Sequence, residues 1–278
     1  MSAKSQKIEA MRLKEIEETI LSEVVAHYIH SEQPIGSMQL KAVIDSGLSS
    51  ATIRNYFRRL VEEGLLTQLH SSGGRIPTYL ALRRYWSETL DYSQNIDLDI
   101  ENAEEIARGY GLYALVQKRE PNRLQEVIET SDGRLIALFA KGSVSVPASA
   151  MIKRLLTEFT GYDLSDLIAF AQSNRIDALY HQLWQIEEQY IERFNVAALA
   201  CLAGQNAATA AALFASFYEG KVSHGLRPGV FFEGVVPQGN MALAQQARLN
   251  EQPAMLVAFG AITRDYHGFI HHMTKEEL

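Results

Sequence analysis

Residues 49–66 read SSATIRNYFRRLVEEGLL, and this stretch decides the fold of the 278-residue chain. A serine at position 49 or 50 is a favourable N-cap, because its hydroxyl accepts a hydrogen bond from a free backbone N–H group of the first helical turn. Apolar residues then recur at helical spacing: Ile53, Phe57, Leu60 and Val61. The opposite face holds Ala51, Asn55, Arg58 and Glu62, with Arg54 and Arg59 on its flanks. The stretch therefore predicts an amphipathic helix with a largely basic outer face.

Two further helices are predicted before this stretch. Over residues 8–30, apolar residues at spacings of three and four share one core face: Leu13, Ile16, Ile20, Val24 and Tyr28. Pro34 and Gly36 end this helix and turn the chain. A short second helix over residues 38–45 follows Ser37 as N-cap and stops at Gly47, with Leu40, Val43 and Ile44 facing inward.

A basic hairpin is predicted after the third helix. Residues 65–70 and 76–79 are short strand-like runs on either side of Gly73-Gly74, and Arg75 lies at the tip. A short helix, a turn, a basic helix and a hairpin in this order are typical of a winged helix-turn-helix, which binds DNA. We assign this domain to residues 1–90.

The candidate DNA-binding residues lie on the third helix and the hairpin. They are Ser49, Ser50, Ala51, Thr52, Arg54, Asn55, Arg58, Arg59 and Arg75. Small residues at the start of the helix permit close approach to the major groove, where Asn pairs with adenine and Arg with guanine. Arg59 lies near the helix end, so a phosphate contact suits it better, and Arg75 is placed to reach the backbone or minor groove. The alternative is a solvated charged face with no nucleic acid.

Charge is divided unevenly along the chain. The net charge is −7, but residues 35–85 hold seven basic and three acidic residues, whereas residues 91–278 carry −8. A basic patch on an acidic body binds phosphate locally and disfavours indiscriminate coating of DNA. The single cysteine, Cys201, excludes an intramolecular disulfide and fits a reducing compartment. With no signal-like segment at the start, we expect a cytoplasmic protein.

The remainder predicts a mixed α+β domain. We expect an acidic linker over residues 91–105, then a domain over residues 106–278 with an insertion near 176–225. Strands are predicted over residues 112–117, 124–129, 134–140, 229–236 and 254–259, with a helix between the last two. Helices are predicted after Pro147 and over residues 164–172 and 176–194. The Ala-rich run over 195–218 favours a buried or interface helix over a membrane span.

Catalytic and metal-binding motifs are not found. The chain has no Gly-rich phosphate loop, no metal-spaced Cys/His set and no nucleophile elbow, so we expect neither an enzyme nor a cofactor. His267, His271 and His272 cluster near the end of the sequence, but without a framed carboxylate we interpret them as surface residues and not as a metal site.

Several sequence blocks of the predicted DNA-binding domain resemble the HrcA family of bacterial heat-inducible transcription repressors. The matching blocks are YI at 28–29, PIGS at 34–37, LSSATIRN at 48–55, LVEEGL at 60–65 and GRIPT at 74–78. Near the other end, Gly260 to Tyr266 resembles the family's GPTRMDY segment. The chain departs from the family at Tyr56-Phe57-Arg58-Arg59, which replaces a less basic run, and at residues 68–74, where the hairpin tip differs.

The resemblance implies a winged helix-turn-helix followed by a GAF-like domain with a helical dimerising insertion. It implies a homodimer on an inverted-repeat operator of chaperone genes, released on heat stress, with a GroEL-type chaperonin as partner. A dimer also follows from the reading of DNA itself, since one winged helix contacts only a few base pairs. The alternatives are a metabolite-responsive regulator with the same DNA-binding domain and a protein that uses this domain to dock another protein.

Overall fold

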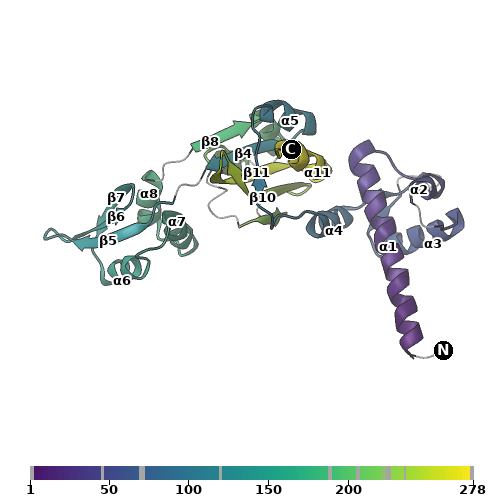
Figure 1. Ribbon diagram of the computed structural model, residues 1–278, viewed down its shortest axis with the longest axis horizontal. Helices are drawn as coiled ribbons and strands as arrows, with labels where there is room; N and C mark the ends of the chain where they lie inside the picture. Colours follow the sequence, from purple (N-terminus) through teal and green to yellow (C-terminus); the bar gives the residue numbers. More distant parts are fainter. Residues whose placement is uncertain are drawn as a thin grey trace.

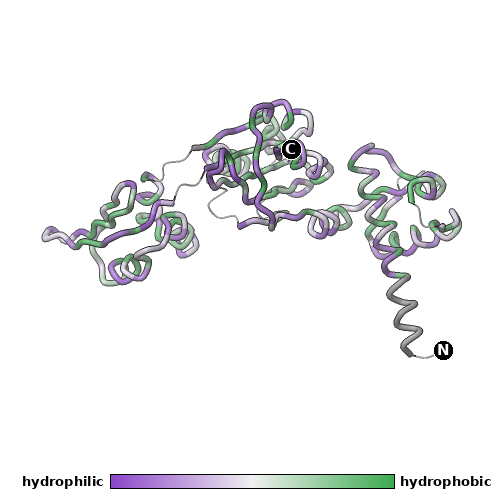
Figure 2. Tube along the Cα trace, viewed as in Figure 1, coloured by the Kyte–Doolittle hydropathy of each residue, from purple (hydrophilic) through white to green (hydrophobic). Residues whose placement is uncertain are grey.

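The computed structural model describes residues 3–44, 47–68, 73–118, 121–186, 190–204, 207–220, 222, 227–234 and 236–275, with side chains except at 3–12, 190, 201–204 and 207. Helices and strands form three groups along one long axis (Figure 1). Hydrophobic stretches run through each group (Figure 2). We name them the N-terminal module (residues 3–90), the body (the described residues of 91–118 and 190–275) and the distal unit (residues 124–186). Within the described ranges, no helix has the length and apolar character needed to cross a membrane.

The N-terminal module contains four helices and a small hairpin. Its elements are α1 (Ala3–Ser31), α2 (Ser37–Val43), α3 (Ser50–Glu62), β1 (Leu66–Thr67), β2 (Ile76–Pro77) and α4 (Tyr79–Thr89). The predicted helices and the antiparallel hairpin are confirmed, with Leu66 opposite Pro77 and Thr67 opposite Ile76. Ser37 was expected as the N-cap of the second helix, but it is the first helical residue and Gly36 is the N-cap. The hairpin residues 69–72 lie outside the described residues.

Three predicted core positions of this module are wrong. Val61 is 38% exposed and Tyr56, 5% exposed, takes its place in the core beside Ile53, Phe57 and Leu60. Residues 53, 56, 57 and 60 still share one helical face, so the stripe is rotated by about one residue. Leu13 and Val43 are also exposed, at 42% and 60%. Their spacing matches the core stripes, so periodicity alone does not separate them from the buried positions.

The body is built on a six-stranded sheet. Its strand order is β3 (Ile96–Asp97), β10 (Asn240–Leu249), β11 (Gln252–Ala261), β4 (Tyr113–Lys118) and β8 (Tyr190–Phe194), with β9 (Gly229–Phe231) also paired to β10. On one face, α5 (Ala103–Tyr110) and α11 (Tyr266–Met273) contribute to the core, and on the other η1 (Val196–Gly204) and α9 (Ala207–Tyr218) do. The chain therefore mixes helices with sheet, as expected.

The helix expected between the last two strands is wrong, because residues 240–249 form β10. This strand pairs antiparallel with β11 along its whole length, from Asn240 opposite Ala261 to Leu249 opposite Gln252. Met241 and Leu243 face one core, and Ala242 and Ala244 face the other. A strand buried on both faces loses the alternation of polar and apolar residues, so its sequence is easily mistaken for a helix.

The distal unit is an excursion between two neighbouring strands of the body, β4 and β8. It consists of β5 (Leu124–Glu129), β6 (Arg134–Phe139), β7 (Gly142–Pro147), α6 (Ala150–Glu158), α7 (Leu164–Ser173) and α8 (Asp177–Gln185). The three strands form their own sheet in the order β5-β6-β7, and the unit has a separate core. The excursion therefore begins about fifty residues before the interval near 176–225 that was expected for an insertion, and only α8 lies within that interval.

Two further expectations differ from the structure. Residues 190–194 form β8 against β4, whereas a helix was expected through residue 194. The residues expected as a linker, 91–105, are folded onto the body: β3 pairs with β10, and Ala103 begins α5 with its side chain fully buried. Acidic residues alternate here with Ile96, Leu98 and Ile100, so the segment has the polar composition of a linker although it contains the edge strand β3.

Asn195 holds the junction between β8 and the start of η1. Its side-chain amide donates to the carbonyl oxygens of Ala107 at 3.2 Å and Leu112 at 2.9 Å, and its backbone φ is +50°. We expect Asn195→Ala to lower the free energy of unfolding by about 1–3 kcal/mol, since the Leu112 carbonyl loses the amide donor and the Ala107 carbonyl keeps only backbone donors. Urea denaturation measures this. Asn174→Ala, at an exposed amide bonded within its own helix, is the control, and equal losses would contradict the assigned role.

Candidate nucleic-acid interface

The start of α3 is fixed by Ser49. Its Oγ accepts a hydrogen bond from the backbone N–H of Thr52 at 3.1 Å and lies 2.9 Å from the Thr52 hydroxyl. Ser49 is therefore the N-cap, and Ser50 is the first helical residue. The positive end of the helix dipole and the free N–H groups of the first turn are presented at this end, where they attract phosphate.

The outer face of α3 brings most of the predicted contacts together. Ala51, Arg54, Asn55, Arg58 and Arg59 are all exposed, whereas the opposite face is buried. Residues three and four apart are neighbours on a helix surface, so Arg54, Asn55 and Arg58 lie side by side over two turns. The small side chain of Ala51 leaves the start of the helix open to close approach.

Arg59 has a different electrostatic setting from the other exposed arginines. Burial raises the pKa of the Glu17 carboxyl on α1, Glu63 raises it further, and the charges of Arg59 and Arg84 lower it. The charge of Arg59 therefore acts on Glu17 of α1, which sets Arg59 apart from Arg54 and Arg58.

Arg75 is tied to the turn before α2 and does not extend from the hairpin tip as expected. Its backbone forms an antiparallel bridge with Ile35, with N···O distances of 2.8 and 3.0 Å. The guanidinium carbon lies 6.0 Å from the centre of the Phe57 ring, and Nη1 donates to the Gly73 carbonyl at 3.3 Å. Arg75 thus joins the hairpin to the buried face of α3, and the spare donors of its guanidinium are held beside that helix.

Gly74 makes this bridge sterically possible. A Cβ atom at position 74 would lie 2.7 Å from the carbonyl carbon and oxygen of Ile35, which is closer than backbone atoms allow. The other end of the hairpin is held by Thr78, which donates from Oγ1 to the Gly64 carbonyl at 2.8 Å and caps α4. The hairpin is therefore attached at two points, to the turn before α2 and to the end of α3.

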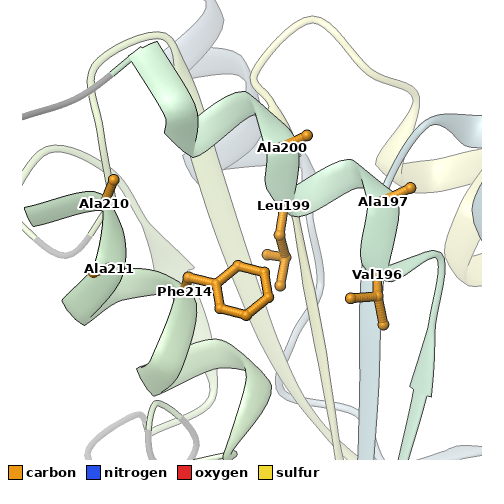
Figure 3. Close-up of a pocket in the computed structure, with 7 residues that line it drawn as sticks. All are labelled: Val196, Ala197, Leu199, Ala200, Ala210, Ala211 and Phe214. Carbon is orange, nitrogen blue, oxygen red and sulfur yellow. The ribbon is translucent and has the colours of Figure 1, made fainter. Parts of the chain in front are cut away.

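An apolar pocket of about 440 Å³ lies away from this face, between η1 and α9 of the body. Its lining side chains are alkyl or aromatic: Val196, Ala197, Leu199, Ala200, Ala210, Ala211 and Phe214. Leu199 and Phe214 point toward each other across it (Figure 3). No group of three or more metal-binding side chains is found in the part of the chain that the structure describes.

The close contact at Gly74 leads to a stability prediction. We expect Gly74→Ala to lower the free energy of unfolding of the N-terminal module by about 1–3 kcal/mol, because the bridge to Ile35 must shift. Gly109→Ala is the matched control: position 109 is helical with nothing within 4 Å of a Cβ, so this change stabilises the protein by up to about 1 kcal/mol. Thermal unfolding of both variants checks the opposite signs; a neutral Gly74→Ala would contradict the close contact.

Comparison with known proteins identifies the family. The HrcA C-terminal domain matches residues 86–277. The heat-inducible transcription repressor HrcA of Helicobacter pylori strain J99 is 31% identical over 262 residues, 94% of this chain and 95% of that protein. The protein of the same name from Helicobacter pylori strain 26695 is 30% identical with the same coverage.

Among solved structures, a crystal structure of a hypothetical protein is 19% identical, with a TM-score of 0.46 over 92% of this chain and 95% of that chain. The sequence matches are the stronger finding, because they span more than half of the chain with the family domain and nearly all of it with the relatives. This chain belongs to the HrcA family.

Proposed function

We propose that the chain is a transcriptional repressor of heat-shock chaperone genes, which binds operator DNA through its N-terminal module. The observation that carries this proposal is the division of α3 into a buried apolar face and an exposed face with Arg54, Asn55 and Arg58. The relatives that align along the whole chain are named heat-inducible transcription repressors, which supports the same activity here.

In this proposal the module is a winged helix-turn-helix and α3 enters the major groove with its capped end first. Asn55 and Arg54 contact base edges, where an amide pairs with adenine and a guanidinium with guanine. Arg58 and the first-turn N–H groups of Ser50 and Ala51 contact phosphates. Ser49 and Thr52 hold the helix end in place, and Arg59 adds a weaker phosphate contact. Arg75 acts beside α3 from the base of the hairpin.

We further propose a homodimer on an inverted repeat. Two modules related by a twofold axis read two half-sites, and their fixed separation selects the spacing of the operator. In this proposal the distal unit makes the contact with the partner subunit. It has its own core and lies at the far end from the module (Figure 1), so a subunit bound there leaves α3 uncovered. The family resemblance supports a GAF-like body, a GroEL-type chaperonin partner and a cytoplasmic location.

A second candidate function is regulation by an apolar metabolite. The pocket between η1 and α9 supports this alternative, since its volume of about 440 Å³ lies within the usual range for small-molecule sites. It lacks the convergent polar groups that orient most ligands, so the heat-shock proposal is preferred.

The DNA-binding face leads to a prediction about affinity and salt dependence. With a duplex carrying a chaperone-promoter inverted repeat, we expect Arg54→Ala and Asn55→Ala each to cost about 1–3 kcal/mol and to relax base preference. Arg58→Ala weakens binding to all sequences and lowers the salt slope by about 1 per site. Arg154→Ala, an exposed arginine of the distal unit, is the control. Gel-shift titrations at several salt concentrations measure both effects; wild-type affinity in all three variants would contradict the assignment of α3.

The second candidate function has its own test. Under that alternative, an apolar metabolite raises the melting temperature of the wild-type chain in a thermal-shift screen. Phe214→Ala removes one wall of the pocket and abolishes the shift. Under the preferred function, metabolites leave both the melting temperature and operator binding unchanged, and a ligand that changes both would favour the alternative.

A further inference from the structure

The N-terminal module meets the body at a small contact, which we name the joint. It places residues 29–32 and 85–89 of the module against residues 262–271 of the body, and Arg83 of the module against Phe232 and Glu233. The helix α4 leads directly into this contact and lies between α1 and the sheet (Figure 1). The joint therefore determines the orientation of the DNA-binding face relative to the rest of the chain.

One buried aromatic side chain anchors the joint. Trp86 is fully buried, and its indole Nε1–H donates to the carbonyl oxygen of Ile262 at 2.7 Å. Its ring meets the Tyr266 ring edge to face, with 5.4 Å between centroids. The Tyr266 hydroxyl in turn lies 3.0 Å from the Met241 carbonyl oxygen and 3.1 Å from that of Gly260. The anchor is thus bonded through Tyr266 to the β10–β11 hairpin, whose two strands pair along their whole length.

The contacts around this anchor are polar and open to solvent. Arg264 Nη1 lies 3.4 Å from Glu32 Oε1, with the two side chains 45% and 62% exposed. His30 Nε2 lies 3.7 Å from Asp265 Oδ2, and His267 Nε2 lies 3.0 Å from the Thr89 hydroxyl. Exposed ion pairs contribute little to stability, because water solvates the separated charges almost as well.

A surface pocket of about 320 Å³ lies beside Trp86, between the module side chains of Ile29 and Tyr85 and the body side chains of Asp265 and His271. Part of the boundary between the module and the body is therefore open to solvent. Within the described ranges, α1 and α4 contact each other, α3 and β2 more extensively than they contact any helix or strand of the body.

We propose that this joint is the element that opens on warming, before either the module or the sheet unfolds, and that its opening releases the operator. Regions with few buried contacts open at the lowest free energy. A closed joint holds two modules of a dimer at the spacing of the half-sites, whereas a freed module must be ordered again at each binding event. This proposal rests on the proposed function of the chain as an operator-binding heat-shock repressor.

The chain offers a direct spectroscopic test, because Trp86 and Trp184 are its two tryptophans. In a Trp184→Phe variant of the full chain, the emission maximum reports Trp86 alone. We expect a red shift on heating with a midpoint below the unfolding midpoint from far-UV circular dichroism, and a loss of operator affinity over the same range as the red shift. Coincident fluorescence and circular-dichroism midpoints would overturn the proposal.

A second variant separates the anchor from general stability. Trp86→Phe keeps an aromatic ring but removes the N–H donor to Ile262, and we expect about five- to tenfold weaker operator binding at elevated temperature, equivalent to one lost hydrogen bond. The Trp184→Phe variant is the control and retains wild-type binding. Operator binding that survives the red shift, or a Trp86→Phe affinity equal to wild type at every temperature, overturns the joint proposal. Failure of the wild-type chain to bind the operator at any temperature overturns the proposed function instead.

Discussion

The strand β11 imposes the constraint on which the rest of the structure depends. It is buried on both faces and paired on both edges, with β10 along its whole length and with β4 on the other side. Both the distal unit and the contact with the N-terminal module follow from the ends of these paired strands. The distal unit leaves from the end of β4. Residues 262–266 continue directly from β11 and include Ile262 and Tyr266, which contact Trp86. One central strand therefore fixes the origin of the distal unit and the docking point of the N-terminal module.

The division of charge follows from the same organisation. A strongly acidic chain binds DNA only if its basic groups are collected away from its acidic surface. The exposed arginines of α3 lie on the module, at the opposite end of the molecule from the distal unit (Figure 1). The charge of Arg59 also acts on Glu17 of α1, and Arg54, Arg58 and Arg59 are all exposed. The fold thus presents a small basic face on an acidic protein.

Local signals in the sequence predicted the helices of the module well. The serine cap and apolar stripe of α3 are short-range features, and Ser49 and Ile53 act as expected. The exchange of Val61 for Tyr56 in the core escaped prediction because it depends on which side of the helix α1 covers. Arg75 was misplaced for a related reason: its position depends on the bridge to Ile35, forty residues away in sequence.

Long-range pairing accounts for the larger differences in the body. β10 and β8 were expected as helices because their residues also fit a helical period, and only the partner strands decide between the two. The role of Trp86 has no local signal at all, since its partner carbonyl belongs to residue 262. The resemblance of residues 260–266 to a family segment marked this region as distinctive but did not indicate its contact with the module.

The most direct measurement of the central claim is hydrogen exchange of the full chain at stepwise increasing temperature. If the DNA-binding module is held by a weak joint on a rigid sheet, amide exchange in residues 86–91 and 264–269 accelerates first, while β10 and β11 remain protected and α3 remains helical. Simultaneous loss of protection in the joint, the sheet and α3 would contradict the account, because the joint would then have no independent opening.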